Sequence, residues 1–507
     1  MKKFLVFIVL ISVTSTAISQ SYYNEWIDYN KTYYKFKVGA TGLYRINNND
    51  LNAIGLANEP AENFQLWRNG KQVPLYTSAV SGPLGANGYL EFWGEKNDGV
   101  SDRDLYKIPA NQLSNEESLL TDTAALFLTV NPAGNNLRFL ATANNIAGNT
   151  LAAEPWFMHS ARNNFKDRIN RGVALVAGSE YVYSSTYDKG EMWSSFDIYP
   201  TSPLSINFNN LHIAAGGPAA SFNIAVAGGT PNQRDYAAEL NNTQITGGKI
   251  NAFEARIDNN SSVPLSVLSS NNAAVRIVNK SGNVNDRIVS GFIELIYPRQ
   301  FDFDNAQSFA FSLAASASSK YLEITNFNAG GNAPVLYDLT NVRRYVADLS
   351  APGKTRFVVL PSSAQANLVL VSQNQAVATA ITTFQQRIFT DFKVSANQGD
   401  YLIITHSSLQ IPYSGANQVD QYRAYRSSVP GGSFNAKIYD IDLLVDQFGY
   451  GIKKNPMGIR NFLRFARTSF ATAPKYAFLI GRGLTYAEYR ENEKNPNADR
   501  LNLIPTF

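Results

Sequence analysis

The chain has 507 residues and a formal net charge of +4, with 17% charged and 44% hydrophobic residues. This length exceeds one ordinary hydrophobic core and predicts two to four domains, while the small, scattered positive charge excludes an extended nucleic-acid-binding surface. Cysteine is absent, which excludes disulfides, a thiol nucleophile and Cys-based zinc sites within these residues.

The first 19 residues have the pattern of a secretory signal peptide. Residues 2 and 3 are lysines, residues 4–13 are apolar, and residues 17–19 are the small Ala-Ile-Ser of a cleavage site. The apolar run is too short to cross a bilayer, and no later segment of the sequence is long enough for a transmembrane helix. We therefore expect cleavage after Ser19 and export of the mature chain.

The region that follows has the pattern of β-rich domains. Short alternating apolar runs are separated by clusters of Gly, Asn, Pro and Ser, which is typical of β-sandwiches. Residues 89–106 indicate a strand leading into an acidic turn, and residues 286–301 indicate one long strand. A polar stretch at residues 162–172 divides the region, so we expect an N-terminal β-rich domain at residues 20–175 and a β-sandwich domain at residues 176–380.

From residue 381 onward, strands and helices are expected to alternate. Strands are predicted at residues 400–408, 436–441 and 474–483, and helices at residues 380–392, 417–428, 442–451 and 456–470. This alternation is typical of a parallel sheet covered by helices. Three strands are about half of the number in an average sheet, so we expect the chain to end inside an incomplete α/β domain at residues 381–507.

The clearest helix of the chain is expected at residues 456–470. Asn455 is a good N-cap, and Pro456 suits the first helical position, where a missing N–H costs nothing. Apolar residues at helical spacing share one face, and three arginines lie on the other, which we interpret as a solvated face. The two sets are Ile459, Phe462, Leu463, Ala466 and Phe470, and Arg460, Arg464 and Arg467.

Four motifs of the C-terminal part occur in a defined order and spacing. They are Thr405-His406, DQFGYGI at residues 446–452, IRNFL at residues 459–463 and Gly481-Arg482-Gly483. Together they resemble the opening of the gingipain-type (caspase-like) cysteine peptidase domain, in particular that of PorU-type sortases of the Bacteroidetes type IX secretion system. Arg482 stands where many relatives carry Asp, and Arg cannot ligate a cation. Three β segments, at residues 33–51, 94–106 and 334–341, resemble the region that precedes this domain in the same family.

The resemblance implies an exported cysteine endopeptidase or sortase that cleaves C-terminal sorting domains from secreted cargo and transfers the cargo to a surface anchor. It implies a catalytic His and Cys beyond Phe507, so no residue of this chain is expected to be catalytic and the fragment alone is expected to be inactive. Secreted proteins with sorting domains are the implied substrates, and an outer-membrane secretion component is an implied partner. The implied location is the outer membrane, the cell surface or the periplasm.

Two further interpretations remain open. The first is a noncatalytic surface or secretion-machinery module made of β-sandwiches, with a degenerate peptidase-like end. The second is a glycan-binding sandwich protein, because exposed tyrosines on sandwiches can bind sugars. No cofactor is expected, apart from a possible structural calcium ion.

Candidate site residues follow the predicted strands of the α/β domain. His406 and the turn Gly481–Gly483 come directly after strands, so they are expected on the rim where a site assembles at the carboxyl edge of the sheet. A histidine that anchors a strand–loop junction is the preferred interpretation of His406. His159 and His212 are expected to be structural.

A candidate calcium loop surrounds Gly99. Asp98, Asp102 and Asp104 would supply oxygen ligands, but the full spacing of a calcium loop and its terminal Glu are absent. A solvated turn is therefore preferred to a structural calcium site.

Overall fold

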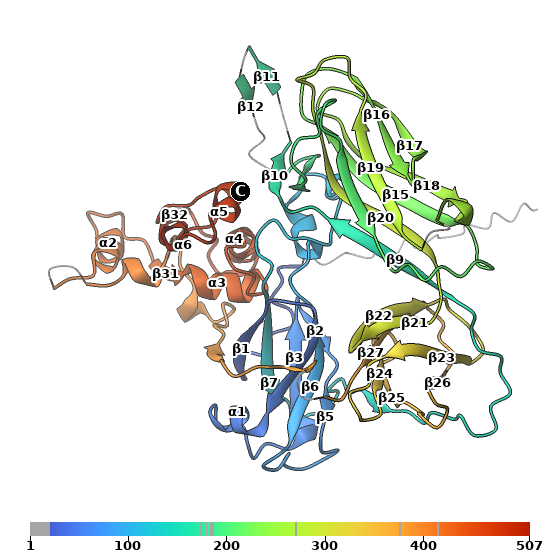
Figure 1. Cartoon of the computed structure of the whole chain (residues 1–507). Coiled ribbons are helices and arrows are strands. Elements are labelled where there is room, and N and C mark those ends of the chain that lie inside the picture. The colour runs from blue at the N-terminus through green and yellow to red at the C-terminus, as the bar shows by residue number, and fades with distance from the viewer. Residues whose placement is uncertain are drawn as a thin grey trace, which may run out of the picture.

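The computed structural model describes residues 21–506, apart from residues 173–174, 179, 183–186, 269–270, 375–376 and 413–414 (Figure 1). The expected signal peptide and Phe507 lie outside the described residues. The architecture is β-rich with a smaller α/β unit, as predicted. No described helix is long and apolar enough to cross a membrane.

The N-terminal part, blue in Figure 1, is a sandwich of two sheets. One sheet has the order β29-β1-β7-β3-β4, with β29 (Gln385–Ile388), β1 (Thr32–Val38), β7 (Ala124–Val130), β3 (Phe64–Arg68) and β4 (Lys71–Val73). The other has the order β28-β2-β6-β5, with β28 (Thr379–Ala380), β2 (Gly42–Asn47), β6 (Tyr89–Gly94) and β5 (Tyr76–Thr77). Alternate residues of both sheets meet in one core, among them Phe36, Ile46, Leu90 and Leu126.

A second sandwich, green in Figure 1, packs two four-stranded sheets together. The first is β14 (Leu204–Phe208), β19 (Ala273–Asn279), β16 (Arg234–Leu240) and β17 (Thr243–Ile250). The second is β18 (Ala255–Val263), β15 (Ala220–Gly228), β20 (Ile288–Arg299) and β9 (Phe157–Asn164). The long strand predicted at residues 286–301 is β20, which pairs with both β15 and β9.

A third β unit lies beside the second. Its first sheet contains, in spatial order, β21 (Asp302–Ala306), β23 (Lys320–Phe327) and β26 (Thr355–Val359). Its second sheet contains, in spatial order, β22 (Ser308–Leu313), β27 (Ala366–Val371), β24 (Val335–Asp338), β25 (Arg343–Val346) and β8 (Leu140–Ala141). Two two-stranded antiparallel sheets, β10 (Arg168–Arg171) with β13 (Glu191–Ser194) and β11 (Leu175–Ala177) with β12 (Glu180–Val182), complete the β region. Strand β9 pairs with β20 across the predicted boundary at residue 175, and the domain division stays a prediction.

The α/β unit, orange to red in Figure 1, has a parallel sheet of order β31-β30-β32. Its strands are β31 (Ala436–Asp440), β30 (Tyr401–Thr405) and β32 (Tyr476–Ile480). Its helices are α2 (Gln418–Ser427), α3 (Ile441–Phe448), α4 (Met457–Ser469), α5 (Tyr486–Glu491) and α6 (Pro496–Leu501); α1 (Asn48–Asn52) belongs to the first sandwich. Phe462 and Phe448 lie at the centre of the core between α3, α4 and the sheet.

Short 3-10 helices connect several of these elements. They are η1 (Ala61–Asn63), η2 (Val100–Leu105), η3 (Pro109–Asn111), η4 (Leu265–Leu268), η6 (Ser395–Asn397) and η7 (Ser407–Leu409).

The helix predicted at residues 380–392 is wrong. Ala380 ends β28, which pairs with β2, and β29 pairs with β1 in the same part of the chain. These two short strands complete the edges of the N-terminal sheets, so long-range pairing overrides the local pattern. The chain thus returns to its first sandwich immediately before the α/β unit begins.

The strand predicted at residues 474–483 forms, but it is not buried. In β32, Tyr476, Phe478 and Leu479 are 53%, 40% and 44% exposed. The reason is position, because β32 pairs with β30 on one side and, within the described residues, with no strand on the other. The apolar composition of a central strand therefore lies at an edge.

The predicted N-cap of α4 is close to the observed one. Asn455 Oδ1 accepts a hydrogen bond from the Met457 N–H at 3.0 Å, and Pro456 directly precedes the first helical residue. The apolar face is buried at Ile459, Phe462 and Phe470, as predicted.

Candidate functional site

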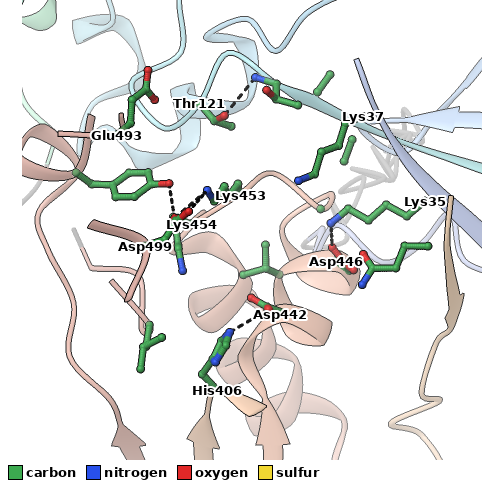
Figure 2. Close-up of a pocket in the computed structure, with 18 of the residues that line it drawn as sticks. Lys35, Lys37, Thr121, His406, Asp442, Asp446, Lys453, Lys454, Glu493 and Asp499 are labelled. Atoms are coloured by element: carbon green, nitrogen blue, oxygen red, sulfur yellow. Dashed lines mark hydrogen bonds and ion pairs between the residues drawn. The ribbon is translucent and has the colours of Figure 1, made fainter. Parts of the chain in front are cut away.

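A cavity of about 1040 Å³ lies between the carboxyl edge of the parallel sheet and the N-terminal sandwich (Figure 2). Strands β1, β7 and β29 supply one side, and residues after β30, helix α3 and the segment around α5 and α6 supply the other. The carboxyl ends of parallel strands are where open α/β sheets place their sites. We therefore take this cavity as the candidate functional site.

His406 lines this cavity directly after β30. Its Nδ1 accepts a hydrogen bond from the Ser408 N–H at 3.1 Å and lies 2.7 Å from Ser408 Oγ. Its Nε2 lies 3.3 Å from Asp442 Oδ2, in the first turn of α3. Because Nδ1 accepts from a backbone N–H, a neutral ring carries its hydrogen on Nε2, toward Asp442. These contacts are those of a strand–loop anchor whose ring also faces the cavity.

Asp446 joins the α/β unit to the N-terminal sandwich. Its carboxylate, on α3, forms ion pairs with Lys35 of β1 and Arg387 of β29 (Lys35 in Figure 2), and the side chain is 1% exposed. Beside it, Gln447 Nε2 donates to the Thr390 carbonyl oxygen at 2.9 Å. A buried carboxylate with two cationic partners fixes α3 against both strands.

The rest of the motif at residues 446–452 packs on the same sandwich. Tyr450 stacks on Tyr23, with ring centroids 4.3 Å apart. Gly451 has φ +71°, and a Cβ there would lie 2.8 Å from Phe127 Cζ, so only glycine fits both the backbone and the space. Sequence reasoning singled out this motif but missed its role as the contact between two units.

The charges around the cavity are predominantly positive. Eight Lys and Arg residues line it against five carboxylates. Most carboxylates are already paired: Asp122 with Arg490 at 2.7 Å, Asp499 with Lys453 at 2.8 Å, and Glu493 with Arg490. Sequence reasoning missed this property, because the cations come from elements far apart in the chain.

Residues 394–507 match the family model described as Peptidase family C25. This segment is therefore similar to the gingipain, or C25, peptidase type, and is called the C25 segment below. The fold of the chain is similar to the crystal structure of dimeric latent PorU from Porphyromonas gingivalis, with a TM-score of 0.61 at 12% identity, covering 94% of this chain and 44% of PorU. The chain thus spans less than half the length of the PorU structure that it matches.

Two solved structures of carbohydrate-binding modules also match, each across 27% of this chain. CBM36 in complex with calcium and xylotriose has a TM-score of 0.18 at 9% identity, covering 27% of this chain and 98% of the module. The CBM36-1 domain of a xylanase from the hindgut metagenome of Trinervitermes trinervoides has a TM-score of 0.18 at 5% identity, covering 27% and 96%. Scores this low support no argument about function. No curated protein matches the sequence.

The glycine turn of the C25 segment is covered by residues near its end. The Arg482 carbonyl oxygen accepts from the N–H groups of Leu503 and Ile504, at 2.9 and 3.0 Å. A Cβ at Gly483 would lie 2.3 Å from the Ile504 oxygen, which explains the glycine there. The turn does not line the cavity, so the structure brings His406 to the site without Gly481–Gly483.

The candidate calcium residues do not converge. Asp102 is buried and accepts from Ser118 Oγ at 2.9 Å and the Leu119 N–H at 2.7 Å, and burial raises its pKa to about 7. Asp98 lies 3.5 Å from an Arg68 nitrogen, whereas Asp104 accepts from the Tyr23 hydroxyl. The prediction of a solvated turn is therefore wrong for Asp102, because its buried carboxyl group accepts hydrogen bonds from Ser118 and Leu119 of the same loop.

The other two histidines have different surroundings. His159 lies in β9 against Phe309, with ring centroids 5.5 Å apart, and burial lowers its pKa to about 4. His212 contacts Asp304, and Asp302 completes a group of three side chains of types that can ligate a metal ion. Arg299 donates to Asp304 at 2.9 Å and already neutralises that carboxylate. Sequence spacing did not indicate this group.

A buried carboxyl group lies where β13 meets the C25 segment. Glu191 is 3% exposed and accepts from the Tyr486 hydroxyl of α5 at 3.0 Å. Burial raises its pKa to about 8, against an ordinary value of 4.5. The folded protein therefore holds Glu191 protonated at neutral pH, whereas the unfolded chain ionises it.

Glu191→Gln is expected to change how stability depends on pH. As pH rises from about 4.5 to about 8, the wild-type unfolded state is increasingly favoured by ionisation, so the folded state loses stability through this group. The glutamine variant lacks this loss and is expected to be more stable near pH 8 by about 1–3 kcal/mol. Urea unfolding of both proteins across this range measures the effect. Glu491→Gln, on the exposed side of α5, is the control, and an equal pH dependence for wild type and Glu191→Gln would contradict the prediction.

Proposed function

We propose that this chain is the N-terminal part of an exported PorU-like cysteine peptidase or sortase. In this proposal the complete protein cleaves C-terminal sorting domains of secreted cargo and transfers the cargo to a surface anchor. The observation that supports it most is the C25-type parallel sheet with a cavity at its carboxyl edge. The proposed location is the outer membrane, the cell surface or the periplasm, with an outer-membrane secretion component as partner.

The chemistry would be supplied outside these residues. A thiolate activated by an imidazole attacks the scissile carbonyl, forms an acyl-enzyme and expels the sorting domain as an amine. An acceptor amine, rather than water, then takes the acyl group. The residues of this chain would hold the sheet that carries those groups, and the Asp446 ion pairs would keep helix α3 against the N-terminal sandwich.

Cleavage of a purified cargo protein that carries its sorting domain tests the proposal. We expect the complete parent protein to release the sorting domain, to form an amide with an added amine, and to lose both activities after iodoacetamide. Mass spectrometry of the products measures each step. The chain of residues 20–507 serves as the control and is expected to cleave nothing, because it contains no cysteine.

A noncatalytic module is the second candidate function. Arg482, where many relatives carry Asp, is the observation that favours it, because its exposed side chain cannot act as an acid or ligate a cation. Absence of cleavage by the parent protein, with unchanged binding of cargo after iodoacetamide, would support the module and contradict the peptidase.

A further inference from the structure

Every carboxylate that lines the 1040 Å³ cavity has a positively charged or imidazole partner. Asp446 is shared by two cations, Asp122 and Glu493 contact Arg490, and Asp499 contacts Lys453. The fifth, Asp442, is 58% exposed and lies beside His406 Nε2. The carboxylates of the cavity thus have their charge partners within the chain.

Half of the eight cationic side chains of the cavity, by contrast, have no direct partner within the described residues. Within the described residues, no hydrogen bond or ion pair joins the side chains of Lys37, Lys454, Lys494 or Arg500 to another group, although all four line the cavity. The four come from separate elements: the end of β1, the loop before α4, the segment between α5 and α6, and α6. Figure 2 shows Lys37 projecting from the β1 side and Lys454 lying near Asp499.

Lys454 is the most confined of these four cations. It is half-buried, its backbone has φ +58°, and burial lowers the pKa of its ammonium group, which Asp442 and Asp499 partly oppose. A desolvated cation without a direct partner gains most from an incoming anion, because the interaction takes place away from bulk water. The cavity therefore favours a ligand that carries negative charge.

We propose that this cavity binds an acidic polypeptide segment, whose carboxylates pair with Lys37, Lys454 and the cations around α6. The choice of a polypeptide rests on the proposed function, because a peptidase-type unit borders the cavity. The separation of the cations onto different sides favours an extended chain with several carboxylates over one compact anion. Cationic side chains around a concave surface also raise the local concentration of such a ligand.

Fluorescence anisotropy with a labelled hexaglutamate peptide tests the inference on the mature chain, residues 20–507. We expect salt-sensitive binding, with a labelled hexaglutamine peptide binding much more weakly. Lys37→Gln combined with Lys454→Gln is expected to weaken hexaglutamate binding about tenfold, since two charge-assisted contacts are removed. Lys107→Gln combined with Lys393→Gln removes the same charge from exposed lysines outside the cavity and is expected to change binding less than about twofold.

Three outcomes of the peptide-binding measurements would overturn the inference: equal weakening by both pairs of substitutions, equal binding of hexaglutamine, or absence of hexaglutamate binding. A second pair, Lys494→Gln with Arg500→Gln, repeats the test on exposed residues if the first pair fails to fold. Inorganic tripolyphosphate is added as a competitor, and stronger binding of tripolyphosphate than of hexaglutamate would replace the polypeptide by a phosphate-bearing ligand. Since this assay needs no catalysis, a parent protein that binds hexaglutamate but cleaves no cargo would refute only the proposed peptidase.

Discussion

Asp446→Ala is expected to destabilise the C25 segment by about 3–5 kcal/mol, because removing one member of a buried ion-paired group leaves the others uncompensated. Lys35 and Arg387 are each 13% exposed and would face each other without the carboxylate between them. Limited proteolysis measures the loss, together with urea unfolding monitored by far-ultraviolet circular dichroism. The ion-paired group connects residues 411 positions apart, so we also expect faster cleavage between the N-terminal sandwich and the α/β unit.

Asp442→Ala, on the same helix, is the matched control. Its carboxylate is 58% exposed, so we expect a change within about 0.5 kcal/mol. Replacing all three charges by apolar residues, with Lys35→Met, Arg387→Met and Asp446→Leu, is expected to restore much of the stability, since no buried charge remains unpaired. If Asp446→Ala unfolds like the wild type, the three charges do not hold the two units together.

The elements that the sequence predicted well are those whose signal is local. Helix α4 was expected at residues 456–470 and is observed at Met457–Ser469, because its cap and its apolar face are encoded within the helix itself. By contrast, the strands β28 and β29 were predicted as a helix. Their conformation depends on pairing with β2 and β1 near the N-terminus, which no local window contains.

The same distinction applies to the candidate site. His406 was expected at the end of a strand and does face the cavity, because a strand end can be read from a short sequence. Lys37 was not expected there, since its place depends on how the N-terminal sandwich packs against the α/β unit. Asp446 belonged to a predicted motif, but its partners Lys35 and Arg387 could be found only in the folded chain.

The exposed strand β32 shows a limit of reading burial from composition. Its sequence, Tyr-Ala-Phe-Leu-Ile, is as apolar as that of a central strand, yet its side chains are largely exposed. Composition reports which residues can be buried, whereas burial depends on which elements lie on either side of the strand. Tyr422 of α2, 5.2 Å from the ring of Phe478, gives partial cover on one face.

Phe462→Ala is the second substitution with a large expected effect, a loss of about 3–5 kcal/mol from the core of the C25 segment. Phe462 is fully buried, and its ring lies 4.8 Å from Tyr439, 5.2 Å from Phe392 and 5.5 Å from Phe448. Truncation removes apolar contacts to strand β31 and helix α3 at once and leaves a cavity that these rings cannot close without moving. Urea unfolding, followed by far-ultraviolet circular dichroism, measures the loss.

Leu463→Ala, one residue further along α4, is the control for the loss of an apolar side chain. Leu463 is only partly buried at the margin of the same core, so a loss of about 1 kcal/mol is expected. The difference between the two variants mainly reports core packing, because replacing Phe or Leu by Ala changes helix propensity by less than about 1 kcal/mol in either case. Equal losses would mean that α4 does not pack against the sheet through Phe462. A large difference would show that this aromatic core stabilises the parallel sheet. It would then also stabilise the geometry of the cavity edge at His406.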